Sequence, residues 1–169
     1  MPAAIRQLGY YTENGDLGLA PSPKRAARLY ARAVALGDVE AMVNLGVLHE
    51  HGLGVRLDYK KMTKYFRMAA DRGDAMAICN LGNSYRSGQG VPNDQAEAAR
   101  CFRQAADMGY TDAQRRLGIM YECGHGVDQD MAEAMRWFER AAARGDHQAR
   151  ANLDLARRYA SVGGINSAP

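Results

Sequence analysis

The sequence predicts an all-α protein built from stacked pairs of helices, and three observations support this fold class. Sixteen of the 18 glycines fall at only four positions of a unit that repeats every 36 residues. Eleven positions are identical in the three full repeats, which are residues 37–72, 73–108 and 109–144. Within each repeat, apolar residues recur at helical spacing. Because a period between about 20 and 50 residues is typical of stacked arrays, each repeat is expected to pack against its neighbours.

The first helix of each repeat, here called helix A, is predicted at about 38–51 in the first full repeat. Ala41, Leu45 and Leu48 lie at i, i+4 and i+7, which places them on one apolar face. The helix is expected to end at Gly52, because glycine readily adopts the left-handed conformation that closes a helix. The apolar Val55 in the following loop is expected to fill the gap between two helices.

The second helix, here called helix B, is expected to begin after Asp58. A short acidic side chain at this position can accept the free N–H groups of the first helical turn. Asp94 and Asp130 stand at the same position in the next two repeats. Glu97 and Glu133, three residues after them, predict capping boxes. Helix B is expected to end at Gly73 and at the glycines that follow it at the repeat period.

Gly46 lies inside helix A, where glycine costs roughly 1 kcal/mol relative to alanine. This cost predicts that another helix passes very close, with the small pair Ala69–Ala70 on helix B as the matching surface. Asp154 replaces the glycine in the last helix, which no helix B follows. The close contact is therefore expected between the two helices of one repeat.

A single array is predicted over residues 1–160, because helices of this length are marginal alone in water and must be held by packing. Its units are about 1–36, 37–72, 73–108 and 109–144, followed by a capping helix at 145–160 and a disordered tail at 161–169. The first unit is irregular, since Asp16 and Leu17 lengthen its loop by one residue.

These residues resemble the Sel-1-like repeat. The shared pattern is Ala-x-x-x-Leu-Gly-x-x-Tyr, then Gly-x-Gly-Val-x-x-Asp, then Phe-x-x-Ala-Ala and Gly, over about residues 3–160. His49 departs from it, because Tyr85 and Tyr121 carry the usual tyrosine at that position. The resemblance implies a right-handed superhelical α-solenoid of stacked antiparallel helix pairs, related to tetratricopeptide repeats. It also implies a non-catalytic adaptor or scaffold that binds a partner protein.

Composition is that of an ordinary soluble protein, with 47% hydrophobic and 24% charged residues. The net charge is only +3 and acidic residues accompany the basic ones, so no nucleic-acid partner is expected. Three cysteines at three different repeat positions fit a reducing compartment better than a disulfide framework. No signal-peptide pattern or membrane-spanning apolar run occurs, so a cytoplasmic protein without a membrane partner is expected if Met1 is the native start.

Exposed positions of helix A are the candidate partner-binding residues, because its apolar face is committed to packing. By analogy with tetratricopeptide arrays, helix A is expected to line the concave surface. The candidates are Glu40, Asn44, Val47, Met76, Asn80, Asn83, Asp112, Arg116 and Asn152. Asn44, Asn80, Arg116 and Asn152 share one repeat position, and a column of amides can hydrogen-bond the backbone of an extended peptide. Alternatively, asparagine tolerates a crowded position there and bonds the adjacent helix.

No cofactor, metal or catalytic residue is expected. His51, Ser87 and Cys123 share a repeat position, but stacked helices lie about 8–10 Å apart and a nucleophile needs its base within about 3 Å. His49 and His51 have no further ligand at zinc spacing. Two alternatives stay open. One is the penicillin-binding or β-lactam hydrolase activity of cysteine-rich relatives, whose paired, in-register cysteines this chain lacks; the other is that further domains of a longer protein carry the function.

Overall fold

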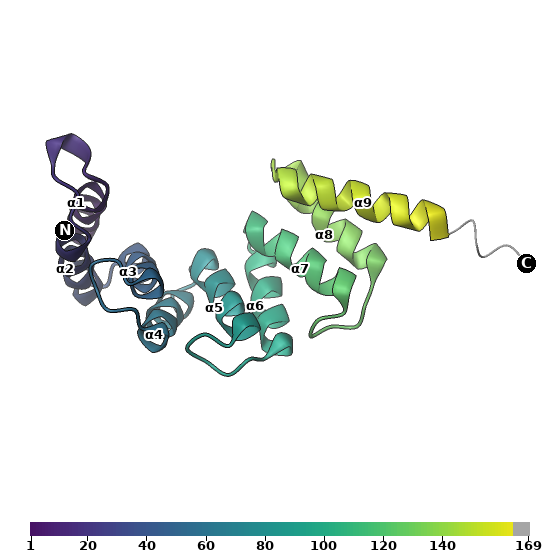
Figure 1. Cartoon of the computed structure of the whole chain (residues 1–169), viewed down its shortest axis with the longest axis horizontal. Coiled ribbons are helices and arrows are strands. Elements are labelled where there is room, and N and C mark those ends of the chain that lie inside the picture. Colours follow the sequence, from purple (N-terminus) through teal and green to yellow (C-terminus); the bar gives the residue numbers. More distant parts are fainter. Residues whose placement is uncertain (164–169) are drawn as a thin grey trace, which may run out of the picture. The chain divides into compact units, whose positions relative to one another are not determined.

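The computed structural model describes residues 1–163, and every regular element within them is helical (Figure 1). The elements are α1 (Pro2–Asn14), the short 3-10 helix η1 (Asp16–Gly18), α2 (Pro23–Ala35), α3 (Val39–His51), α4 (Tyr59–Ala70), α5 (Ala75–Ser87), α6 (Gln95–Asp107), α7 (Thr111–Cys123), α8 (Met131–Ala143) and α9 (His147–Gly163). The predicted all-α fold of helical repeats is confirmed.

Within each of the two compact units of the chain, helices that follow one another in sequence pack against one another. Within repeats, α1 packs on α2, α3 on α4, and α7 on α8; between repeats, α2 packs on α3, α4 on α5, α6 on α7 and α8 on α9. The chain divides after Asn93 into two compact bodies, here the N-terminal body and the C-terminal body, which are described separately. We retain one continuous array over residues 1–160 as a prediction.

The interior glycine of helix A makes room for an aromatic ring of helix B. A methyl group added at Gly46 would lie 2.6 Å from Cε1 of Phe66, and one added at Gly118 would lie 2.5 Å from Cε1 of Phe138. The predicted close contact between the two helices of one repeat is therefore confirmed for these pairs. Its partner is the phenylalanine ring rather than the Ala69–Ala70 pair, because the flat ring reaches across to the helix A backbone.

Helix B ends in a Schellman motif at the predicted glycine. Gly73 N–H donates to the Ala70 carbonyl at 2.8 Å, and Asp74 N–H donates to the Ala69 carbonyl at 3.2 Å. Asp74 Oδ1 then accepts from Ala77 N–H at 2.7 Å, which caps α5. One residue thus closes helix B and opens the next helix A, a double role that the sequence analysis missed; Asp38 and Asp146 repeat it.

Helix B begins at the predicted aspartates. Asp58, Asp94 and Asp130 each accept a hydrogen bond at 2.9 Å from the backbone N–H three residues later. At Asp58 this bond, from Lys61 N–H, holds the pKa of the carboxyl below its usual range. The predicted capping box at Glu133 is wrong, because Asp130 N–H donates instead to a carbonyl of helix A, that of Tyr121, at 3.0 Å.

The two ends of the array depart from the regular repeat. The longer first loop forms η1, where Leu17 adopts the left-handed conformation with φ of 57° and is exposed. At the other end, α9 buries Ala149, Leu153 and Ala156, and it continues through Gly163, three residues into the segment predicted to be a tail. The remainder of that segment, 164–169, lies outside the described residues.

Tyr30 replaces phenylalanine in the first repeat. Its ring is buried against Gly9, and its hydroxyl donates to the Glu13 carboxylate at 2.8 Å. Burial, and then the bond to Glu13, raise the pKa of Tyr30 well above its ordinary value of 10.0. The folded protein therefore keeps a proton that the unfolded chain releases at high pH.

Stability is expected to fall as the pH rises above about 10, because only the unfolded state then loses the Tyr30 proton. The contribution is fully present below the unfolded pKa and is lost as the pH climbs toward the higher folded pKa. Tyr30→Phe should flatten this dependence. The test is urea unfolding of both proteins across the alkaline range; an equal pH dependence in the variant would assign the effect to other tyrosines.

Candidate functional site

The candidate residues of the N-terminal body lie on the part of helix A that the core leaves uncovered, here called the open face of helix A. They recur at i, i+4 and i+7 of each helix: Glu40, Asn44 and Val47 on α3, and Met76, Asn80 and Asn83 on α5. Glu40 and Met76 are exposed, and the other four are half-buried. The core residues between them, such as Leu45 and Leu48, are buried.

The asparagine side chains of this face have unused hydrogen-bonding capacity. Within the described residues, the amides of Asn44 and Asn80 make no hydrogen bond to an adjacent helix. The Oδ1 atom of Asn83 is buried and has no hydrogen-bond partner. These observations count against the alternative in which the asparagine column bonds a neighbouring helix.

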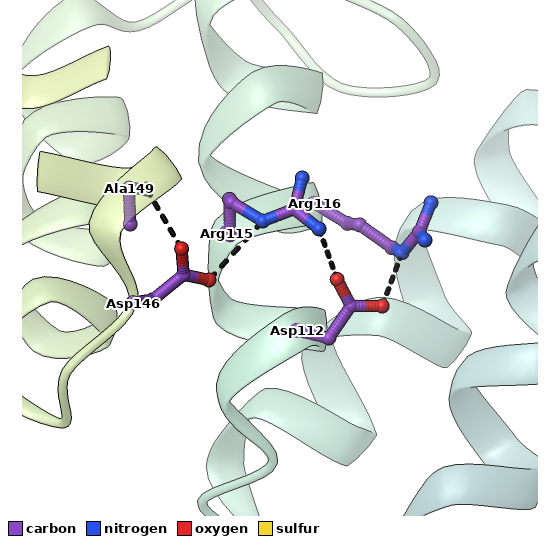
Figure 2. Close-up of polar contacts among 5 residues, drawn as sticks. All are labelled: Asp112, Arg115, Arg116, Asp146 and Ala149. Atoms are coloured by element: carbon purple, nitrogen blue, oxygen red, sulfur yellow. Dashed lines mark hydrogen bonds and ion pairs between the residues drawn. The ribbon is translucent and has the colours of Figure 1, made fainter. Parts of the chain in front are cut away.

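In the C-terminal body, the candidate residues Asp112 and Arg116 are tied into a charged network (Figure 2), and the third candidate, Asn152, is half-buried on α9. The Arg116 Nε donates to Asp112 Oδ2 at 2.6 Å, and Arg115 pairs with the other Asp112 oxygen. Arg115 Nε also donates to Asp146 Oδ2 at 3.1 Å, while Asp146 Oδ1 accepts from Ala149 N–H at the start of α9. The network orients Arg116, whose two terminal nitrogens lie on the side away from Asp112 (Figure 2).

The N-terminal body contains a matching network that the sequence analysis did not find. Arg6 Nε lies 3.1 Å from Asp38 Oδ1, and Arg6 Nη1 lies 2.6 Å from Glu40 Oε2. Arg6 and Arg115 stand three residues before the interior glycine of their repeats, and each pairs with the aspartate that caps the next helix A. An arginine at this repeat position, together with an aspartate at the start of the next helix A, is the sequence pattern from which both networks could have been predicted. Glu40 is thus engaged by the preceding repeat.

The histidine that departs from the repeat pattern is a packing residue. His49 is buried, its Nδ1 lies 3.2 Å from the Arg56 carbonyl oxygen, and its ring stacks on Tyr65 with centroids 5.7 Å apart. Across the described part of the chain, no three His, Cys, Asp or Glu side chains are placed to hold a metal ion. Residues 1–163 also include no helix with the length and apolarity to cross a membrane.

Comparison with known proteins identifies the repeat. A model of the Sel1 repeat matches four consecutive segments, 2–38, 39–74, 75–110 and 111–146. A Sel1 repeat protein from Oxalobacter formigenes superposes with a TM-score of 0.87 at 33% identity, covering 92% of this chain and 63% of that one. The protein c5321, a protective antigen present in uropathogenic Escherichia coli strains and displaying an SLR fold, superposes with a TM-score of 0.85 at 32% identity.

The c5321 alignment covers 90% of this chain and 32% of that one, so the chain spans less than two thirds of either structure. Cysteine rich protein B from Helicobacter pylori shares the fold, with a TM-score of 0.62 at 24% identity over 77% of this chain and 93% of that one. No curated protein sequence matches.

Proposed function

This chain belongs to the Sel1 repeat family, and on that premise we propose that it is a non-catalytic scaffold that binds a partner protein or extended peptide along the open face of helix A. Proteins of this family generally mediate protein–protein interactions. The three cysteines stand at unrelated repeat positions, so no observation favours the β-lactam alternative.

The observation that carries the proposal is the row of half-buried asparagine amides without partners. An amide offers both a donor and an acceptor, which suits the alternating C=O and N–H groups of an extended peptide. Asn44 and Asn80 stand at the same position of successive helices A, and Asn83 adds a buried oxygen that lacks a donor. A bound backbone would supply partners for the amides of Asn44 and Asn80.

The C-terminal body offers a different chemistry at the same repeat position. Arg116 carries donors only, and Asp112 holds its Nε so that the terminal nitrogens are oriented before a ligand arrives. Such a fork suits a carbonyl or carboxylate oxygen of the partner. The change from Asn to Arg along the column therefore supports selection of one partner sequence over another.

Replacing Asn44, Asn80 and Arg116 together by alanine is expected to weaken partner binding by about a hundredfold, since each lost hydrogen bond is worth about 1 kcal/mol. Affinity capture with mass spectrometry identifies the partner, and calorimetry with the purified pair measures the affinity. Gln104→Ala with Arg150→Ala, at exposed positions outside the open face, serves as the control. Undiminished affinity of the triple variant, with unchanged helicity, would remove the proposed role of this face.

A further inference from the structure

Basic residues are unevenly distributed over the B helices. The helices α2 and α4 of the N-terminal body together carry eight Lys and Arg residues and no acidic residue. The helices α6 and α8 of the C-terminal body carry four basic and four acidic residues. The small net charge of the whole chain therefore conceals a strongly basic surface in the N-terminal body.

The contrast holds position by position. Lys24 and Lys60 share a repeat position that is alanine in the third and fourth repeats. Arg28 and Lys64 share another repeat position, which is Arg100 in the third repeat and Arg136 in the fourth. Each of these two arginines forms an ion pair on its own helix, Arg100 with Glu97 at 2.7 Å and Arg136 with Glu133 at 3.0 Å. Within residues 1–163, Lys24, Arg28, Lys60 and Lys64 make no ion pair.

These cations line two successive grooves on the N-terminal body. The first is a cavity of about 450 Å³ where α2, α3, α4 and the loop after α3 meet. Lys24, Arg28, Arg56 and Lys61 line it without any acidic side chain, and Lys61 has only a 4.0 Å contact with Asp58. The second cavity, of about 300 Å³, lies between α4 and the loop at Gly90 and Val91. Lys60, Lys64 and Arg67 line it together with one acidic residue, Asp71.

The lining of the first groove identifies the chemistry of its occupant. Val55 is half-buried between the cationic side chains, and the buried residues Ala27 and Leu45 form the apolar floor of the groove. Unpaired cations gathered around one cavity favour a negatively charged ligand. The apolar surface between them favours a ligand that also projects an apolar side chain into the groove.

A polynucleotide fits this groove less well. Proteins that bind single strands stack bases on exposed aromatic faces. The aromatic ring here is Tyr65, and one of its faces is already covered by the stacked ring of His49. A lipid surface could contact the cations. Because it is flat, it could not reach the apolar residues Leu45 and Ala27, which are buried behind the cationic side chains.

We propose that the groove between α2 and α4 is a second docking surface, which binds a short acidic peptide segment of a partner protein with an apolar side chain between its carboxylates. This surface is separate from the open face of helix A. It recognises its ligand by charge and an apolar anchor, whereas the open face uses asparagine side-chain amides that bond a peptide backbone.

Fluorescence anisotropy of the full chain with a labelled peptide of glutamates flanking one leucine tests the proposal. Lys24→Ala with Arg28→Ala should weaken binding about tenfold, and rising salt should weaken it further. Arg100→Ala with Arg136→Ala is the matched control, because it removes two positive charges from the C-terminal body, both at the repeat position of Arg28. Changing the leucine of the peptide to serine should also lower the affinity.

Ala31→Glu is an independent variant that places a carboxylate in the groove. Ala31 is exposed and lines the cavity, and the fourth repeat carries Glu139 at this position, so the fold accommodates the change. We expect it to weaken peptide binding as strongly as the double alanine variant. Circular dichroism of each variant confirms that the helices are intact.

Three results would overturn the proposal. One is an absence of peptide binding at millimolar concentration; another is an equal loss in the groove and control variants, which would reflect net charge alone. The third is binding of a single-stranded oligonucleotide or of phosphatidylserine vesicles in preference to the peptide. The Asn44, Asn80 and Arg116 variant should still bind the acidic peptide, so the two surfaces are tested separately.

Discussion

Gly90→Ala is expected to destabilise the protein by about 3 kcal/mol or more, whereas Gly73→Ala should cost only about 1–2 kcal/mol. Both glycines have positive φ, 76° and 82°, so alanine meets the same backbone strain at either position. The two differ in their surroundings. A methyl group at Gly90 would overlap the Tyr59 carbonyl and the Thr63 hydroxyl, and nothing lies within 4 Å of one at Gly73.

The Tyr59 carbonyl belongs to the first turn of α4 and cannot move without displacing that helix. Gly90 therefore sets how closely the loop of the third repeat approaches the helix B of the second. Chemical denaturation followed by far-UV circular dichroism measures both variants. An equal loss of stability in the two variants would mean that backbone strain alone accounts for the glycine at position 90. The close approach of the loop to α4 would then contribute nothing to stability.

Phe138→Ala is expected to cost about 3–5 kcal/mol, because it empties the centre of the fourth repeat. Phe138 is fully buried, and its ring lies against the backbone of α7 at Gly118. Gly118 has no side chain with which to fill the space. The loss should appear as a lower urea midpoint for unfolding of the C-terminal body.

Phe138→Tyr is the matched control and should cost less than about 1.5 kcal/mol. In the first repeat, Tyr30 occupies this position and bonds Glu13, and Glu122 stands at the repeat position of Glu13. A tyrosine at 138 would therefore have an acceptor of the same kind. Equal stability of the alanine and tyrosine variants would contradict the prediction, because it would show that the aromatic ring does not stabilise the packing of α7 against α8.

Several features of the fold followed from the sequence because their causes lie within one helical turn. Asp58 caps a helix whose free N–H groups are three residues away, and Gly73 closes one through bonds to residues just before it. The open face of helix A was likewise predictable, since residues at i, i+4 and i+7 share a side of any helix. These conclusions required no knowledge of how the helices pack.

Other features depended on contacts between distant residues. The capping box at Glu133 failed because the Asp130 N–H bonds a carbonyl of the preceding helix instead. The ring that fills the space at Gly46 belongs to Phe66, twenty residues along the chain, and not to the alanine pair that matched it in size. In both cases the sequence allowed more than one contact partner, for the Asp130 N–H and for the space at Gly46. The packing of two helices decided which partner makes the contact.

The repeat, its helices, the aspartate caps of helix B and the side of helix A left uncovered were determined by the sequence itself, because short-range hydrogen bonding and helical periodicity operate within one segment. Only the tertiary structure decided that Arg115 bonds Asp146, 31 residues away, and that cations of α2 and α4 share a groove. Those contacts depend on how one repeat stacks on the next, and stacking geometry is a property of two segments together.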